Sequence, residues 1–208
     1  MLSTFPVGWR HADAPDYLPI GIPEADVALQ GCPRGRITEI VGPRSSGRTS
    51  LLHSILAAST NREEFAVLLD INDAFDLCSA SAAGVQLSQL IWIRCNGNVE
   101  HALRSADLVL HSGGFGVVAL DMAEASDSSL HRIPATTWFR FRRAVETTPT
   151  VLAVIGRKAI TKSCSAMLVE MKRRRALFTG NLLRGVDYEI SPRKPIGKEQ
   201  IALHRAAV

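Results

Sequence analysis

The first segment whose residue types could do chemistry runs from Gly42 to Thr49 and reads Gly-Pro-Arg-Ser-Ser-Gly-Arg-Thr. Two glycines separated by four residues, with a hydroxyl residue at the end, have the spacing of a phosphate-binding loop. Such a loop holds an anion with backbone N–H groups and the N-terminus of the following helix. One position departs from the motif, because Arg48 stands where lysine is expected.

The loop predicts a nucleotide site with ATP and Mg²⁺ as candidate cofactors. Asp121 ends an apolar run and is the expected carboxylate on the metal side, where Thr49 would supply a hydroxyl. The candidate nucleotide-binding residues are Gly42, Ser45, Ser46, Gly47, Arg48, Thr49 and Ser50, and the candidate metal-side residues are Thr49 and Asp121.

The exchange at Arg48 leaves two outcomes open. Lysine is a compact point charge, whereas arginine is planar, longer and suited to forked contacts. Arg48 either swings outward to a carboxylate, which would leave a weak or empty nucleotide site, or contacts phosphate with poorer transition-state geometry. Whether ATP is bound or hydrolysed therefore depends on where this side chain lies.

Composition limits the class of protein. The chain has 208 residues, of which 46% are hydrophobic and 21% charged, enough for one substantial core. No apolar run approaches the roughly 20 residues that span a bilayer, so we expect a soluble cytoplasmic protein without membrane contact. The four cysteines are widely scattered, and we expect reduced, buried thiols rather than a metal site.

Charge is distributed unevenly along the chain. Residues 1–130 hold 8 basic and 15 acidic side chains, whereas residues 131–208 hold 16 basic and 5 acidic ones. Such a split favours nucleic acid or an acidic protein surface as a partner of the C-terminal part, and a solvated basic surface is the alternative.

Apolar patterning predicts strands alternating with helices, which is typical of a doubly wound, mainly parallel sheet. Short strand-like segments at the C-terminus leave no room for crossover helices, so an antiparallel finish is expected. The predicted organisation is an N-terminal arm or loosely packed lead-in over 1–22, a core domain over 23–192 and a basic tail over 193–208. Expected helices cover 23–30, 50–58, 73–83, 99–111 and 136–146, and expected strands cover 36–41, 65–70, 90–94, 116–121, 150–155, 165–171, 186–190 and 200–204.

Two stretches carry a family resemblance. One is Gly-Arg-Ile-Thr-Glu-Ile-Val followed by the phosphate loop, and the other is the strand that ends at Asp70. Together they resemble the RecA recombinase family, and most closely the small RecA-like accessory proteins of bacterial mutagenic repair, the ImuA group. The resemblance covers roughly residues 20–180 and implies an α/β RecA-like P-loop NTPase fold.

The same resemblance implies a degenerate ATPase. Active members carry a water-activating glutamate two residues after the aspartate at the strand end, and here that position holds Asn72. An amide cannot act as a general base. Asp73 is adjacent, but it would have to shift register to replace the missing carboxylate.

Basic residues in the C-terminal part are candidate nucleic-acid contacts. The DNA-binding loop of the family is shortened here, which leaves Arg157, Lys158 and Lys162, and the run Lys172-Arg173-Arg174-Arg175 follows. Phosphate contacts would give sequence-independent, salt-sensitive affinity, whereas the run could also be a solvated turn. In contrast, Trp138, Phe141 and Val145 share a helical stripe and are expected in the core.

The resemblance implies a RecA-like accessory factor in DNA repair and damage-induced mutagenesis, within translesion synthesis and the SOS response, with weak or no ATP hydrolysis. Its expected partner is a repair polymerase or polymerase-like protein, and single-stranded DNA is a further candidate. Two alternatives stay open, namely a slow DNA-dependent ATPase and a SulA-like cell-division inhibitor that binds a tubulin-like protein.

Overall fold

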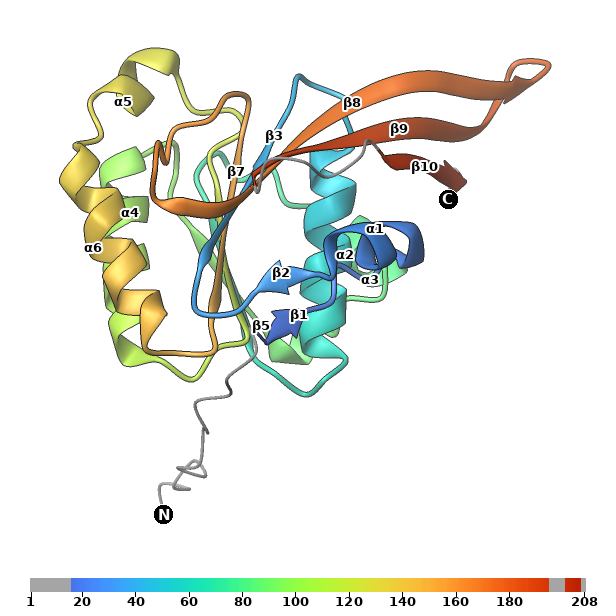
Figure 1. Ribbon diagram of the computed structural model, residues 1–208. Helices are drawn as coiled ribbons and strands as arrows, with labels where there is room; N and C mark the ends of the chain where they lie inside the picture. The colour runs from blue at the N-terminus through green and yellow to red at the C-terminus, as the bar shows by residue number, and fades with distance from the viewer. Residues whose placement is uncertain (1–15, 195–200, 207–208) are drawn as a thin grey trace.

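Figure 1 shows a computed structural model of the chain, which describes residues 16–194 and 201–206. Its centre is one sheet of eight strands. In chain order these are β3 (Ile37–Val41), β4 (Ala66–Asp70), β5 (Leu90–Arg94), β6 (Val117–Asp121), β7 (Val151–Gly156), β8 (Ser165–Thr179), β9 (Leu182–Lys194) and β10 (Ile201–Ala206).

The order of strands in the sheet is β10-β9-β8-β3-β7-β6-β4-β5. From β8 to β5 all neighbouring strands are parallel, whereas β9 and β10 pair antiparallel. This confirms the predicted α/β fold with a mainly parallel sheet and an antiparallel C-terminal finish. The strand β10 lies within the segment 193–208 that the sequence analysis sets apart as a basic tail, so part of that segment extends the sheet.

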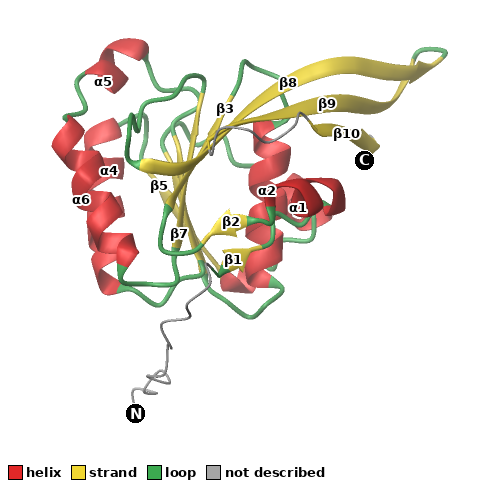
Figure 2. Cartoon of the chain, in the orientation of Figure 1, coloured by secondary structure: helices red, strands yellow, loops and turns green. Residues whose placement is uncertain are grey.

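Helices cover both faces of the sheet (Figure 2). On one face lie α1 (Pro23–Leu29), α2 (Arg48–Thr60) and α3 (Leu77–Ala82), and on the other lie α4 (Val99–Ser112), α5 (Asp127–His131) and α6 (Ala135–Glu146). A 3-10 turn covers Leu87–Gln89, and a small second sheet joins β1 (Tyr17–Leu18) to β2 (Cys32–Pro33).

The parallel strands bury side chains on both faces. In β4, Leu68 packs in one apolar cluster with residues of α2, and the next residue, Leu69, packs in a second cluster with α6. This is why the strands read as continuous apolar runs rather than alternating ones. The predicted stripe of α6 is confirmed, because Trp138, Phe141 and Val145 are at most 1% exposed.

The start of the chain differs from the expectation of a loosely packed lead-in. Leu18 is 0% exposed and Ile20 is 1% exposed, and both belong to the cluster around α2. The Asp26 carboxylate accepts the N–H groups of Ile20 and Gly21 at 2.6 and 3.0 Å, which ties this segment to α1. Loose packing is therefore wrong for residues 17–20, and residues 1–15 lie outside the described part.

Three further expectations need correction. The helix predicted from Asp73 begins only at Leu77, because residues 71–75 form a loop held by Asp70. The basic run from Lys172 is not a turn but the middle of β8, which is much longer than predicted. Cys78 is exposed, whereas the other three cysteines are buried as expected.

In the described residues, no helix has the length and apolar character needed to cross a membrane.

Candidate nucleotide-binding site

The chain passes from β3 into α2 through the predicted phosphate loop. Ser45 and Gly47 have left-handed backbone conformations, with φ of 60° and 89°, and Gly47 is the N-cap of α2. Gly42 is required by close approach, because a Cβ there would clash with the Met171 carbonyl oxygen and the Ser46 hydroxyl. The first N–H groups of a 13-residue helix have no intrahelical acceptor, so the loop has the form of an anion cradle.

The hydroxyl groups of the loop differ in exposure. Ser45 and Thr49 are exposed and Ser50 is half-buried. Ser46 is 1% exposed, and its Oγ has no hydrogen-bond partner among the described residues. Because buried polar groups are nearly always paired, an unpaired hydroxyl inside a phosphate loop fits a bound anion.

The side chain of Arg48 does not swing out to solvent. It is 6% exposed, and its Nη1 donates a hydrogen bond of 2.7 Å to the carbonyl oxygen of Gly156 at the end of β7. Burial lowers the pKa of this guanidinium, and the nearby carboxylates of Asp121 and Glu124 oppose that shift. The guanidinium of Arg48 is thus held at the carboxyl end of β7. It does not swing outward to pair with a carboxylate, which was one of the two outcomes left open by the sequence.

Asp121 lies at the expected end of β6, next to β7. Its Oδ1 accepts the N–H of Ala123 at 2.9 Å. Burial, with a smaller contribution from Asp70, raises the pKa of Asp121 to about 6, although Arg48 and the Ala123 N–H favour the charged form. This carboxylate therefore titrates closer to neutral pH than an ordinary aspartate, and it interacts electrostatically with Arg48.

The residues present fit Mg²⁺ only together with a nucleotide. In the described part of the chain, no group of three or more His, Cys, Asp or Glu could hold a metal ion. Mg²⁺ in phosphate-loop sites uses one or two protein oxygens, several waters and the phosphates. Thr49 and Asp121 are the predicted protein oxygens of such a set, and a bound ion would neutralise phosphate charge.

The loop after β4 carries Asn72, the position at which the family resemblance implies a general base. Asp70 accepts the N–H groups of Ala74 and Phe75 at 3.1 and 2.9 Å, so its carboxylate fixes the loop after β4. Asn72 is exposed in this loop. Asp73 pairs with Arg94 of β5 at 3.2 Å, at the edge of the sheet farthest from β8. The carboxylate nearest in sequence to Asn72 is thus already in an ion pair.

An aromatic side chain from the C-terminal strands covers the loop. The ring of Tyr188 on β9 lies so close to Gly47 that a Cβ there would be 2.9 Å from it. A cavity of about 300 Å³ adjoins this contact, lined by Ile22 and Glu24 at the start of α1 and by Ser50, Met171 and Tyr188. Sequence analysis missed Tyr188, since it is 141 positions from Gly47 and only the antiparallel return of β9 brings it there.

Residues 11–129 match the sequence profile of the RecA N-terminal domain, which is more than half of the chain. The chain belongs to the RecA family. RecA-family membership confirms the resemblance drawn from the phosphate loop at the level of the family, and the finer assignment to the ImuA group stays a prediction.

Individual RecA proteins match over about half of this chain. Protein RecA of Methylococcus capsulatus is 38% identical over 112 residues, which cover 53% of this chain and 32% of that protein. Protein RecA of Bacteroides thetaiotaomicron is 34% identical over 125 residues, covering 59% and 38%, and that of Thermus thermophilus is 37% identical over 112 residues, covering 53% and 33%. The match therefore spans only about a third of the length of these relatives.

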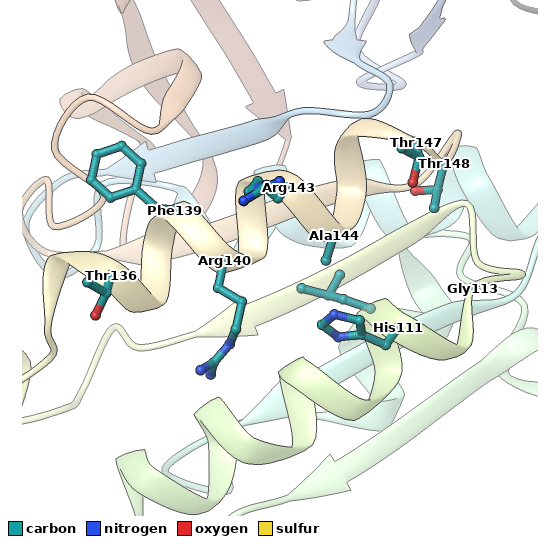
Figure 3. Close-up of a pocket in the computed structure, with 10 residues that line it drawn as sticks. His111, Gly113, Thr136, Phe139, Arg140, Arg143, Ala144, Thr147 and Thr148 are labelled. Atoms are coloured by element: carbon teal, nitrogen blue, oxygen red, sulfur yellow. The ribbon is translucent and has the colours of Figure 1, made fainter.

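A second hollow of this RecA-like core lies between α4 and α6, away from the phosphate loop (Figure 3). It has a volume of about 640 Å³ and includes His111 of α4 and Phe139, Arg140 and Arg143 of α6. Arg140 is already bound, because its Nε donates to the Asp107 carboxylate at 2.7 Å. Two arginines of α6, Arg140 and Arg143, therefore line this groove.

The loop after β7 is held by hydrogen bonds and ion pairs. Glu39 of β3 accepts the N–H groups of Ile160 and Thr161 at 2.6 and 3.1 Å, and the Thr161 hydroxyl at 2.5 Å. Arg157 and Lys158 both pair with Asp127, at 3.2 and 3.3 Å. Two of the predicted nucleic-acid contacts of this loop are therefore partly neutralised, whereas Lys162 is exposed.

Proposed function

We propose that this protein is a RecA-like accessory factor in DNA repair and damage-induced mutagenesis, acting through protein and DNA contacts with weak or no ATP hydrolysis. Membership of the RecA family supports a DNA-related role. The proposal of weak or no ATP hydrolysis rests on the position of Arg48, which is buried and hydrogen-bonded to the Gly156 carbonyl oxygen.

Two features around the loop support low turnover. Asn72 cannot accept a proton from water, and Asp73 is engaged by Arg94. Tyr188 covers Gly47, so a nucleotide must find room beside or displace this ring. Loss of the base and of the catalytic point charge together would remove most of the electrostatic stabilisation on which phosphoryl transfer depends.

The proposed partner is a repair polymerase or polymerase-like protein, as the resemblance to the ImuA group implies, and the proposed compartment is the cytoplasm. The charge split supports a partner for the basic C-terminal part, because 16 basic and 5 acidic side chains lie after residue 130. Within this role, the phosphate loop would serve as a sensor or a relic rather than a motor.

The test has two arms. Calorimetry with ATP and Mg²⁺ on the wild type and on Gly47→Asp measures whether the loop binds nucleotide, and phosphate release measures turnover. Purified Y-family polymerase homologues are then tested for a complex by size-exclusion chromatography. Efficient hydrolysis, or no complex with any such polymerase, would contradict the proposal.

A slow DNA-dependent ATPase is the second candidate, and the intact cradle favours it. Gly42, the left-handed Ser45 and the unpaired Ser46 hydroxyl preserve an anion site that a pure scaffold has no physical need to keep. The same observation argues against a SulA-like division inhibitor. Steady phosphate release that is stimulated by DNA and lost in Thr49→Ala would establish the ATPase.

A further inference from the structure

Beyond the body of the domain, β8 and β9 continue as a projecting two-stranded ribbon (Figure 1). Alternate residues of β8 are buried as far as Met171, and from Lys172 to Arg175 every residue is exposed. The neighbour β3 pairs with β8 only up to Glu170, and β10 pairs with β9 only from Gly185 to Ile190. We call residues 172–189 the arm; at its base, Tyr188 still contacts the phosphate loop and β9 still pairs with β10.

The arm is basic. It carries five basic residues and only two acidic ones, Asp187 and Glu189. Arg174 pairs with Glu189 at 2.7 Å and Arg175 pairs with Asp187 at 3.6 Å, while Lys172 reaches back to Glu170 at 3.4 Å. The two remaining basic residues, Arg173 and Arg184, have no carboxylate partner within the described part of the chain.

The tip of the arm is apolar and open to solvent. Phe178 is 61% exposed and Leu182 is 56% exposed, on either side of the turn at Gly180. Both side chains lie at the end of a projecting ribbon, outside the apolar core, so they are accessible to a partner. An exposed aromatic ring between arginines can stack on a nucleic-acid base, and stacking tolerates any sequence.

We propose that the arm binds single-stranded DNA, with Arg173 and Arg184 on backbone phosphates and Phe178 stacked on a base. This deepens the DNA contact in the proposed function. The excess of arginine favours an anionic polymer, and Arg157 and Lys158 of the shortened loop are already paired with Asp127. A ribbon of eight residues per strand extends about 25 Å, long enough to contact several phosphates.

The first experiment measures binding of the full chain to a fluorescein-labelled oligothymidine of 25 nucleotides by anisotropy, without nucleotide or polymerase. Arg173→Ala/Arg184→Ala should reduce the slope of log affinity against log salt by about 1.4, since each single-strand phosphate contact contributes about 0.7. Arg132→Ala/Arg143→Ala, which removes the same charge near α5 and α6, should keep the wild-type slope. Equal slopes in both double variants would overturn the proposal.

The tip is tested separately, because a protein partner would also use apolar residues. Phe178→Ala and Phe178→Leu should each weaken oligonucleotide binding about fivefold or more, since leucine keeps the apolar surface but cannot stack. Leu182→Ala, at the same tip, should bind like the wild type. Wild-type affinity in Phe178→Leu, or no binding by the wild type at 50 mM salt, would overturn the assignment.

These binding experiments distinguish a failure of the arm to bind DNA from a failure of the proposed polymerase contact. Circular dichroism and thermal melting first establish that each variant is folded, and the exposed positions make that outcome expected. Because no polymerase and no ATP are present, a failure of the arm to bind DNA leaves the polymerase contact intact. Conversely, DNA binding through the arm would persist if every polymerase complex failed.

Discussion

At the residue scale, the position of the Arg48 side chain decides what the phosphate loop can do. Arg48 gives its Nη1 hydrogen bond to Gly156, whereas a shorter lysine on the same backbone would present a compact charge near the phosphates. The loop therefore retains the backbone of an anion site, while the guanidinium of Arg48 connects α2 to the end of β7. Nucleotide affinity and turnover can be changed separately here.

Arg48→Lys should raise ATP affinity about tenfold, equivalent to about 1.4 kcal/mol, while phosphate release stays at background because Asn72 supplies no base. Calorimetry and a phosphate assay measure the two effects. Arg62→Lys, on the exposed turn after α2, is the control and should change neither. Rapid hydrolysis by Arg48→Lys alone would mean that another residue activates water.

Asp121 gives stability a pH dependence. Its folded pKa of about 6 lies above the ordinary 3.8, so the folded state loses relative stability as the pH rises from about 4 to about 6. Asp121→Asn removes this cost, and its advantage over wild type in unfolding free energy should be about 2 kcal/mol larger at pH 7.5 than at pH 4.5. Urea unfolding in EDTA measures it.

A control of opposite sign accompanies Asp121→Asn. The Lys158 ammonium lowers the pKa of Asp127, so that carboxylate stabilises the fold above its unfolded pKa and the contribution is lost as the pH falls. Asp127→Asn should therefore be less stable than wild type at pH 7.5 and approach it at acid pH. Equal pH profiles for both variants would show that Asp121 is not desolvated as described.

At the element scale, β3 connects the phosphate loop to the loop after β7. It lies between β7 and β8, its end enters the phosphate loop, and Glu39 at its centre accepts three hydrogen bonds from Ile160 and Thr161. One strand thus fixes both the anion cradle and the loop after β7.

Glu39→Ala should lower the free energy of unfolding by about 3 kcal/mol, because it leaves the buried N–H of residue 161 and the part-buried N–H of residue 160 without an acceptor. Urea unfolding measures the loss, and hydrogen exchange should show faster exchange at these two amides. Glu146→Ala removes a carboxylate from an exposed pair with Arg36 and should cost no more than about 0.5 kcal/mol. A similar loss in both variants would refute the anchoring role.

Sequence predicted those elements whose burial leaves a pattern. Strands buried on both faces, such as β4 and β6, appear as apolar runs, and the stripe of α6 appears at helical spacing. The arm leaves no such pattern, because every side chain from Lys172 to Arg175 is exposed and β3 stops pairing with β8 at Glu170. From the sequence alone, a basic run in an exposed ribbon cannot be told apart from a solvated turn.

At the scale of the whole molecule, the chain divides into a body and an arm. The residues of the phosphate loop are adjacent in sequence and were predicted together. The contacts that define their state join distant segments, since Arg48 and Gly156 are 108 positions apart and Tyr188 reaches Gly47 from β9. These contacts form only when all strands have taken their places in the sheet, and no local sequence pattern predicts that strand order.

The division predicts that the arm can be shortened without loss of the body. Residues 178–184 would be replaced by Asn-Gly, a two-residue turn that joins the paired residues Leu177 and Gly185. The exposed tip contributes little burial, so the unfolding free energy should change by less than about 1 kcal/mol and the melting temperature by about 2–4 °C at most. Thermal and urea unfolding provide the measurement.

The shortened protein also isolates the two proposed sites from each other. Its ATP affinity should equal that of the wild type, because Tyr188 and the phosphate loop are retained, whereas oligonucleotide binding should fall with the loss of Phe178 and Arg184. A large drop in stability would show that the tip packs on the body. Unchanged DNA binding would place the nucleic-acid contact on the body, with Lys162 as the next residue to substitute.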